Sequence, residues 1–248
     1  MAYEALAASY DRLTRDIPYE EIFAFYRRIL ADCGANPASA VDLACGTGSM
    51  SILLARAGME VVGVDQSEEM LTVAYEKAMD LERRPYFVRQ KLQRLRLPAP
   101  VDLAVCCLDG INYVTEPEQV REVFSRVFRS LRPGGLFIFD VNSRAKLSSL
   151  DGQIFVDEDD DVFCLWRAEY DRQTGLCRYG MDIFRREGKL WARSAEEHLE
   201  RAYGTEELTD WLLEAGFADA RLYGDRRPEP PAPDEQRIFL AARRPTTL

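Results

Sequence analysis

The stretch from Ala40 to Ser67, AVDLACGTGSMSILLARAGMEVVGVDQS, constrains the fold of this 248-residue chain more than any other. In it, an apolar run leads into a turn with two glycines, then an amphipathic helical pattern, a second apolar run and an acid. Strands that follow one another through a crossover helix favour a parallel sheet. Because such sheets bind ligands at the carboxyl ends of their strands, we expect the glycine turn to lie at a ligand site.

The same alternation of short apolar runs and helical patterns continues to about residue 142. Crossover units of this kind predict an α/β fold with helices on both faces of the sheet. Two helical patterns, near 3–13 and 18–32, precede the first strand, and we expect them at the edge of the sheet or over its carboxyl end. The expected strands lie at 39–44, 59–65, 86–90, 101–107 and 136–142, and the expected helices at 49–57, 67–82 and 116–131.

The pattern changes from about Gln153 to Arg201, where polar and apolar residues alternate as they do in antiparallel strands. Turn signals at 173–175 and 187–189 separate these runs. The expected antiparallel strands lie at 162–171, 176–187 and 189–201, and they are followed by a helix at 205–216 and closing strands at 218–224 and 236–242.

The glycine turn differs from a dinucleotide-binding turn. Ser51 stands where the third glycine of a G-x-G-x-x-G motif would follow Gly46 and Gly48. Asp42 would repel a pyrophosphate, but it would suit a ligand that carries a cation or an ammonium group. Together with Asp65, which ends the second strand, these residues are more specific than a glycine pair alone.

The motif VDLACGTG resembles the first motif of class I S-adenosylmethionine-dependent methyltransferases. VVGVD, DQSEEML and LRPGG are similar to three further motifs of that family, and the resemblance extends from Ala40 to about Val141. It implies a Rossmann-like seven-stranded sheet with helices on both faces, and an inserted antiparallel β lid like that of glycine N-methyltransferase. The implied parts are an N-terminal helical lid (1–35), a cofactor-binding core (36–150 and 204–248) and the inserted substrate lid (151–203).

The resemblance implies that the cofactor is S-adenosylmethionine. Asp42 would contact its ammonium group, and Asp65 would accept hydrogen bonds from both ribose hydroxyls, for which a carboxylate offers two oxygens. The other implied cofactor-binding residues are Ala44, Gly46 and Gly48 beside the methionine part, Met70 beside the adenine with Gln66 from the same motif, and Cys107 and Leu108 beside the sulfonium.

One position departs from the family pattern. After the third strand the family has an acid that contacts the adenine amino group, whereas this chain has Lys91. Lysine cannot accept a hydrogen bond. Either Gln90 or a backbone carbonyl takes that role or the adenine site is altered, and the backbone amide of Leu92 is a further candidate.

The candidate catalytic residues are Asn112, Tyr113 and His198. The first two belong to CCLDGINYV, which in the family opens toward the substrate; the alternative is that they cap a turn and fill the core. His198 is the only histidine and could act as a general base or be structural. Near the N-terminus, Tyr10 is similar to a family tyrosine that folds over the cofactor, and Tyr19 is a second candidate.

Composition restricts the partners. A net charge of −10 provides no basic footprint, and no N-P-P-Y-type motif or Pro-Cys pair is present, so nucleic acid is not an expected partner. The absence of a long apolar run and of a signal peptide predicts a cytoplasmic protein that does not use a membrane. One histidine, and six cysteines without a C-x-x-C pair, predict no metal site. The expected partner is a small-molecule methyl acceptor, and we expect a monomer or a homodimer.

Methyl transfer to an O, N or C nucleophile of a small molecule is the favoured hypothesis. A methyltransferase that acts on RNA or protein would use the same fold. A non-catalytic cofactor-binding regulator is a second alternative, which Lys91 keeps open. An NAD-dependent oxidoreductase is disfavoured by Asp42 and by the lack of a Tyr-x-x-x-Lys pair.

Overall fold

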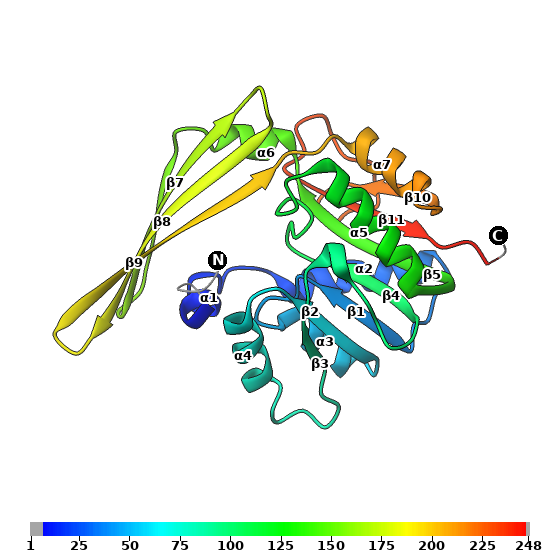
Figure 1. The fold of residues 1–248 in the computed structure, drawn as a ribbon, viewed down its shortest axis with the longest axis horizontal. Coiled ribbons are helices and arrows are strands. Elements are labelled where there is room, and N and C mark those ends of the chain that lie inside the picture. Colours follow the sequence, from blue (N-terminus) through cyan, green and yellow to red (C-terminus); the bar gives the residue numbers. More distant parts are fainter. Residues whose placement is uncertain (1–6, 247–248) are drawn as a thin grey trace.

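The computed structural model describes residues 7–246 and contains two sheets (Figure 1). A seven-stranded sheet with its helices makes up most of the molecule. A four-stranded antiparallel sheet extends away from it, and α1 (Ala7–Leu13) lies in the angle between the two. The predicted fold class, a Rossmann-like sheet with an inserted antiparallel sheet, is confirmed.

The strand order of the larger sheet is β10-β11-β5-β4-β1-β2-β3. The order reverses between β1 and β4, because β1 pairs in parallel with β2 on one side and with β4 on the other. Ligand sites of open α/β sheets lie at the carboxyl ends of the strands at such a reversal. The strands are β1 (Ser39–Leu43), β2 (Glu60–Asp65), β3 (Tyr86–Arg89), β4 (Val101–Cys106), β5 (Leu131–Asn142), β10 (Ala218–Tyr223) and β11 (Arg237–Arg243), and β11 is antiparallel to both its neighbours.

Side chains alternate across these strands and fill two separate cores, one on each face of the sheet. In β1, Val41 belongs to one core and Ala40 to the other. The first core is covered by α5 (Pro117–Ser130) and α7 (Thr205–Glu214), and the second by α2 (Tyr19–Asp32) and α3 (Ser49–Arg56). A further helix, α4 (Glu68–Lys77), packs near β2 and β3.

The position of α2 corrects one prediction. We expected it at the edge of the sheet or over its carboxyl end, but it covers a face. Its apolar side chains recur at helical spacing, and the ring of Phe25 meets that of Phe239 edge to face, with centroids 5.2 Å apart. An apolar stripe of this width is stable only when it is buried along its length, which a sheet face allows and an edge does not.

The smaller sheet has the order β6-β7-β8-β9, and every pair in it is antiparallel. One face packs against α1, where Tyr10 and Leu13 contact the buried side chains of β7 and β8. A short helix, α6, connects β5 to this sheet (Figure 1). The bounds are α6 (Arg144–Ser149), β6 (Ile154–Glu158), β7 (Val162–Asp171), β8 (Leu176–Glu187) and β9 (Leu190–Arg201).

Most element bounds agree with the sequence pattern, and β7 and β8 have the predicted limits. The sequence did not predict β6, α6 or the 3-10 turn η1 (Leu92–Arg94). Residues 3–6 of the first predicted helix lie outside the described residues. Within residues 7–246, no helix combines the length and the apolar character that crossing a membrane requires.

Candidate active site

The glycine loop after β1 runs through left-handed backbone conformations. Ala44, Gly46 and Gly48 have φ values of 52°, 52° and 77°. A Cβ at Gly46 would meet no atom within 4 Å, whereas one at Gly48 would come within 2.9 Å of Ala74 and Phe87. The loop therefore leaves its Gly46 side open to a ligand, while Gly48 lets α3 pack closely on its neighbours.

The carboxylate of Asp65 connects the glycine loop to α4. One oxygen accepts the backbone N–H of Gly46 at 2.9 Å, and the other accepts that of Ser67 at 2.9 Å. Ser67 in turn caps α4 by accepting the backbone N–H of Met70 at 3.2 Å. Burial raises the pKa of Asp65, and these backbone hydrogen bonds oppose that effect. The group is thus held in a fixed orientation at the end of β2.

The carboxylate of Asp42 is buried and only partly satisfied. Its Oδ2 accepts a hydrogen bond from the Ser51 hydroxyl at 2.6 Å, whereas its Oδ1 has no hydrogen-bond partner among residues 7–246. Burial raises the pKa of Asp42 to about 7. A buried acceptor without a partner is costly. A cationic or hydrogen-bond-donating ligand at Oδ1 would remove that cost.

The loop after β4 is fixed by a buried ion-pair network. Leu108 and Asp109 both have positive φ, 57° and 55°, and their backbone N–H groups donate to the Asp140 carboxylate at 2.9 and 3.1 Å. Arg237 of β11 donates to Asp140 and, at 2.9 Å, to Asp109. Such strained backbone persists only where its surroundings hold it in place, and it is frequent at functional sites.

The two N-terminal helices place Tyr10 and Tyr19 over the same region, where they share a side-chain hydrogen bond. Burial raises the pKa of both phenols. Next to Tyr10, Asp11 accepts a hydrogen bond from Thr47 of the glycine loop at 2.6 Å and pairs with Lys77 of α4 at 2.6 Å. These contacts attach α1 directly to the glycine loop.

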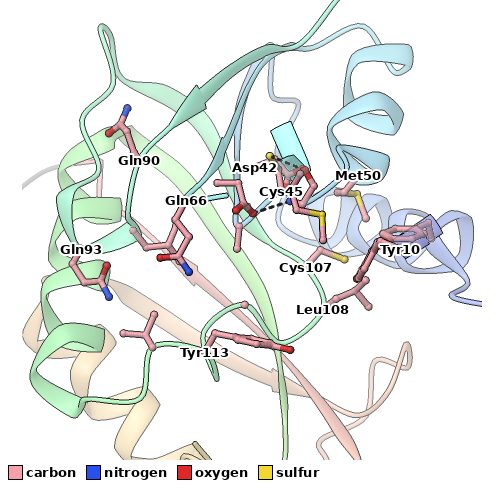
Figure 2. A pocket seen from close by; sticks show the side chains of 18 residues that line it. Tyr10, Asp42, Cys45, Met50, Gln66, Gln90, Gln93, Cys107, Leu108 and Tyr113 are labelled. Atoms are coloured by element: carbon pink, nitrogen blue, oxygen red, sulfur yellow. Dashed lines mark hydrogen bonds between the residues drawn. The ribbon is translucent and has the colours of Figure 1, made fainter. Parts of the chain in front are cut away.

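One pocket at the carboxyl ends of β1, β2 and β4 is lined by Asp42 and Asp65, by part of the glycine loop and of the loop after β4, and by Tyr10 and Tyr19 (Figure 2). In Figure 2, Gln90 and Gln93 lie at one end of the pocket and Tyr10 at the other, with Asp42 and Cys45 between them. Eleven of the predicted site residues line it: Tyr10, Asp42, Ala44, Gly46, Asp65, Gln66, Met70, Leu92, Cys107, Leu108 and Tyr113. Further lining residues are Tyr19, Cys45, Met50, Gln90, Gln93, Gly110 and Val114.

Four predicted site residues lie outside this lining: Gly48, Lys91, Asn112 and His198. Lys91 is exposed and stands just before η1. The neighbouring Gln90 does line the pocket, but its side-chain amide is hydrogen-bonded to the backbone N–H and C=O of Arg96 at 2.9 and 3.1 Å. The position where the family has an acid therefore presents no carboxylate to this end of the pocket.

Asn112 is buried and joins the loop after β4 to two strands. Its amide donates to the backbone carbonyls of Asn142 and Arg201, at 3.0 and 2.8 Å, and its oxygen accepts the N–H of Asn142 at 3.0 Å. These contacts agree with the structural role that the sequence analysis gave as the alternative to catalysis for Asn112. His198, on β9, is also buried, and its Nδ1 lies 3.4 Å from the hydroxyl of Tyr113, a residue of the pocket lining.

Some lining residues had a sequence signal and others had none. Cys45 stands inside the glycine motif, and Gly110 follows the fourth strand, where a Cβ would come within 2.7 Å of the Cys106 sulfur. Gln93 and Val114 reach the pocket only through the path of their loops, which no local motif specifies.

Known proteins resemble both the sequence and the fold. The family model "Methyltransferase domain" matches residues 40–135. YqeM of Bacillus subtilis (strain 168), provisionally named a methyltransferase, is 32% identical over 100% of this chain and 99% of its own length. Demethylmenaquinone methyltransferase of Staphylococcus aureus (strain JH9) is 29% identical over 89% of this chain and 85% of its own. The crystal structure of an S-adenosylmethionine-dependent methyltransferase from Clostridium acetobutylicum ATCC 824 is 30% identical, has a TM-score of 0.88 and covers 99% and 100% of the two chains.

Proposed function

Because this chain belongs to the class I S-adenosylmethionine-dependent methyltransferases, we propose that it methylates an oxygen, nitrogen or carbon nucleophile of a small molecule. The observation that carries the choice of a small molecule is the composition of the pocket lining. None of the eighteen lining residues is lysine or arginine, so the pocket offers no basic group to a phosphate backbone. The similarity to demethylmenaquinone methyltransferase supports the same class of acceptor.

The residues of the pocket fit the cofactor at two points. The Oδ1 of Asp42 needs a donor, and the α-ammonium group of S-adenosylmethionine would supply one. Each Asp65 oxygen accepts one backbone N–H and keeps acceptor capacity for a ribose hydroxyl. The adenine end carries glutamines and Leu92 instead of an acid, so we propose that amide or backbone groups contact the adenine there.

The bound cofactor supplies an electrophilic methyl group on a sulfonium. The residues of this chain would then align the acceptor and exclude water. Tyr10 and Tyr19 would cover the reacting end from the side of the N-terminal helices. The loop from Cys107 to Gly110 would form the opposite wall, held by Asp140 and Arg237. Alignment and desolvation of this kind contribute much of the rate when the electrophile is already strong.

Calorimetric titration with S-adenosylmethionine, S-adenosylhomocysteine and NAD in parallel tests the cofactor assignment. We expect binding of the first two only. Formation of S-adenosylhomocysteine would then be followed with a panel of a catechol, 1,4-naphthoquinol and a primary amine, which offer oxygen, carbon and nitrogen nucleophiles. Turnover of RNA or protein substrates by a protein that leaves every small acceptor unmodified would contradict the small-molecule proposal.

A further inference from the structure

We infer that Tyr113, His198 and Glu196 form a relay that accepts the proton of a hydroxyl-bearing methyl acceptor; this inference rests on the proposed function. The Tyr113 hydroxyl lies 3.4 Å from His198 Nδ1, and His198 Nε2 lies 2.9 Å from Glu196 Oε2. Tyr113 lines the pocket from the turn after β4, and the other two belong to β9. In Figure 2, the Tyr113 hydroxyl lies on the Leu108 side of the pocket, away from Gln93.

The chemistry of the three groups gives the relay a direction. When Glu196 is ionised, its carboxylate only accepts hydrogen bonds, and the His198 nitrogen that faces it then carries the hydrogen. In the neutral imidazole the other nitrogen, Nδ1, is then a bare acceptor for the Tyr113 O–H. The His198 and Glu196 side chains are only 1% and 5% exposed, so water competes little for these bonds.

The relay would move one proton per methyl transfer. A hydroxyl of the acceptor next to Tyr113 gives its proton to the phenolic oxygen, while the phenolic proton passes to His198 Nδ1. The electron pair left on the acceptor forms the new bond to the methyl carbon, and the electrons of the broken carbon–sulfur bond remain on sulfur as a neutral thioether. Glu196 stabilises the resulting imidazolium, which later releases its proton to solvent.

This arrangement favours a hydroxylated acceptor over an amine. A neutral amine attacks with its own lone pair, whereas a hydroxyl is a weak nucleophile until it is ionised. Ionising a hydroxyl allows methylation at the oxygen or, on an aromatic ring, at an activated carbon. Product analysis would distinguish these two outcomes.

A purely structural role for the relay would duplicate contacts that already exist. Asn112 attaches the same turn to β9 through the Arg201 carbonyl, and the backbone N–H of Arg201 donates to the Asn112 carbonyl at 2.8 Å. The Arg201 guanidinium also donates to the Thr115 carbonyl at 3.0 Å. The turn is thus held on β9 without the Tyr113 to His198 contact.

The test uses the nitrogen NMR spectrum of the only histidine in the full-length protein, labelled with 15N-histidine and saturated with S-adenosylhomocysteine. We expect hydrogen on Nε2 and a bare Nδ1. Tyr113→Phe should shift the Nδ1 signal and leave the tautomer unchanged, whereas Glu196→Gln should allow the other tautomer. Tyr86→Phe and Glu197→Gln are matched controls on exposed side chains and should leave the spectrum unchanged.

Two results would overturn the relay even when S-adenosylhomocysteine binds. One is hydrogen on Nδ1 of His198 in the wild-type protein, and the other is an Nδ1 signal that Tyr113→Phe does not shift. Loss of S-adenosylhomocysteine binding by the wild-type protein would instead contradict the proposed function, so the two failures are distinguishable. With any hydroxyl acceptor from the panel, Tyr113→Phe should lower kcat about 100-fold at unchanged cofactor affinity, and an unchanged kcat would also overturn the relay.

Discussion

The two sheets of this molecule bury charge in different ways. The seven-stranded sheet has a core on each face, and at its carboxyl edge Arg237 binds the wholly buried Asp140. On the four-stranded sheet, Arg193 is 63% exposed and covers Asp182 from the solvent side. Removing one partner of a buried ion pair leaves an uncompensated charge, whereas solvent replaces an exposed partner. Substitutions of charged residues should therefore be costly at the carboxyl edge of the seven-stranded sheet and tolerated on the outer face of the smaller sheet.

The largest expected effect of this difference concerns the two arginines. Arg237→Gln should lower the free energy of unfolding by about 3–5 kcal/mol, because Asp140 and Asp109 lose their cationic partner inside the protein. The matched change Arg193→Gln should cost about 1 kcal/mol or less, since its guanidinium is exposed and Arg167 still pairs with Asp182. Denaturant unfolding measures both values, and equal losses would contradict the comparison.

Replacing a glycine should likewise destabilise the protein more beside the seven-stranded sheet than in the four-stranded sheet. Gly48→Ala should cost about 3 kcal/mol, because the left-handed backbone is strained by a Cβ and that Cβ would collide with Ala74 and Phe87. Gly188, in the turn between β8 and β9, has φ +65° but no atom within 4 Å of a Cβ, so Gly188→Ala should cost about 1 kcal/mol. A cost at Gly188 equal to that at Gly48 would show that backbone strain alone decides both.

Ligand binding should depend on the carboxylate at the end of β2 and not on the carboxylates of the smaller sheet. Asp65→Asn should weaken S-adenosylhomocysteine binding about 10-fold to 100-fold, because it replaces a charged acceptor by a neutral amide. Asp171→Asn, at the end of β7, should leave the affinity unchanged. Calorimetry on the two variants would measure this, and unchanged affinity in Asp65→Asn would remove the residue from the ribose site.

The smallest effect is a pH dependence of binding. Burial raises the pKa of Asp42 to about 7, and an ammonium group beside it would favour the charged form and lower that pKa. Affinity for S-adenosylmethionine should therefore rise as pH increases through 7, with a fraction of a proton released on binding below that pH. Calorimetry at pH 6.5 in buffers of different ionisation enthalpy measures the release, and Asp42→Asn should abolish it.

The carboxylate on the smaller sheet provides the contrast. Arg193 and Arg167 hold the pKa of Asp182 below its usual range, so it is already ionised over the same pH interval. Asp182→Asn should leave proton release on binding unchanged. If Asp182→Asn abolished the proton release on binding, Asp42 would not be the source of the proton.

Local patterns predicted the larger sheet well because its strands and helices each bury a continuous apolar face. The same reasoning predicted β7 and β8 but missed β6, whose Ile154, Phe155 and Val156 form an exposed edge without alternation. It also misplaced α2, because an apolar helix face does not by itself reveal which surface it covers.

In the candidate site, the residues of the glycine motif and the acid after β2 could be predicted to lie at the pocket, since their positions follow from short spacings along the chain. The contacts of His198 were not, because its partners come from a turn about 85 residues earlier and from Glu196, two residues before it in a charged run. Nothing in the sequence indicated that Asn112 would bind the backbones of β5 and β9.

The sequence alone determined the succession of strands and α-helices in the larger sheet, the glycine loop and the positions of Asp42 and Asp65, because each depends on local periodicity or on a few neighbouring residues. Only the tertiary structure decided that α1 lies between the two sheets, that Arg237 closes the network behind Leu108 and Asp109, and that Tyr113 meets His198. These contacts join residues separated by tens to more than a hundred positions. Contacts between residues so far apart in the sequence arise from the fold of the whole chain, and short-range patterns do not specify them.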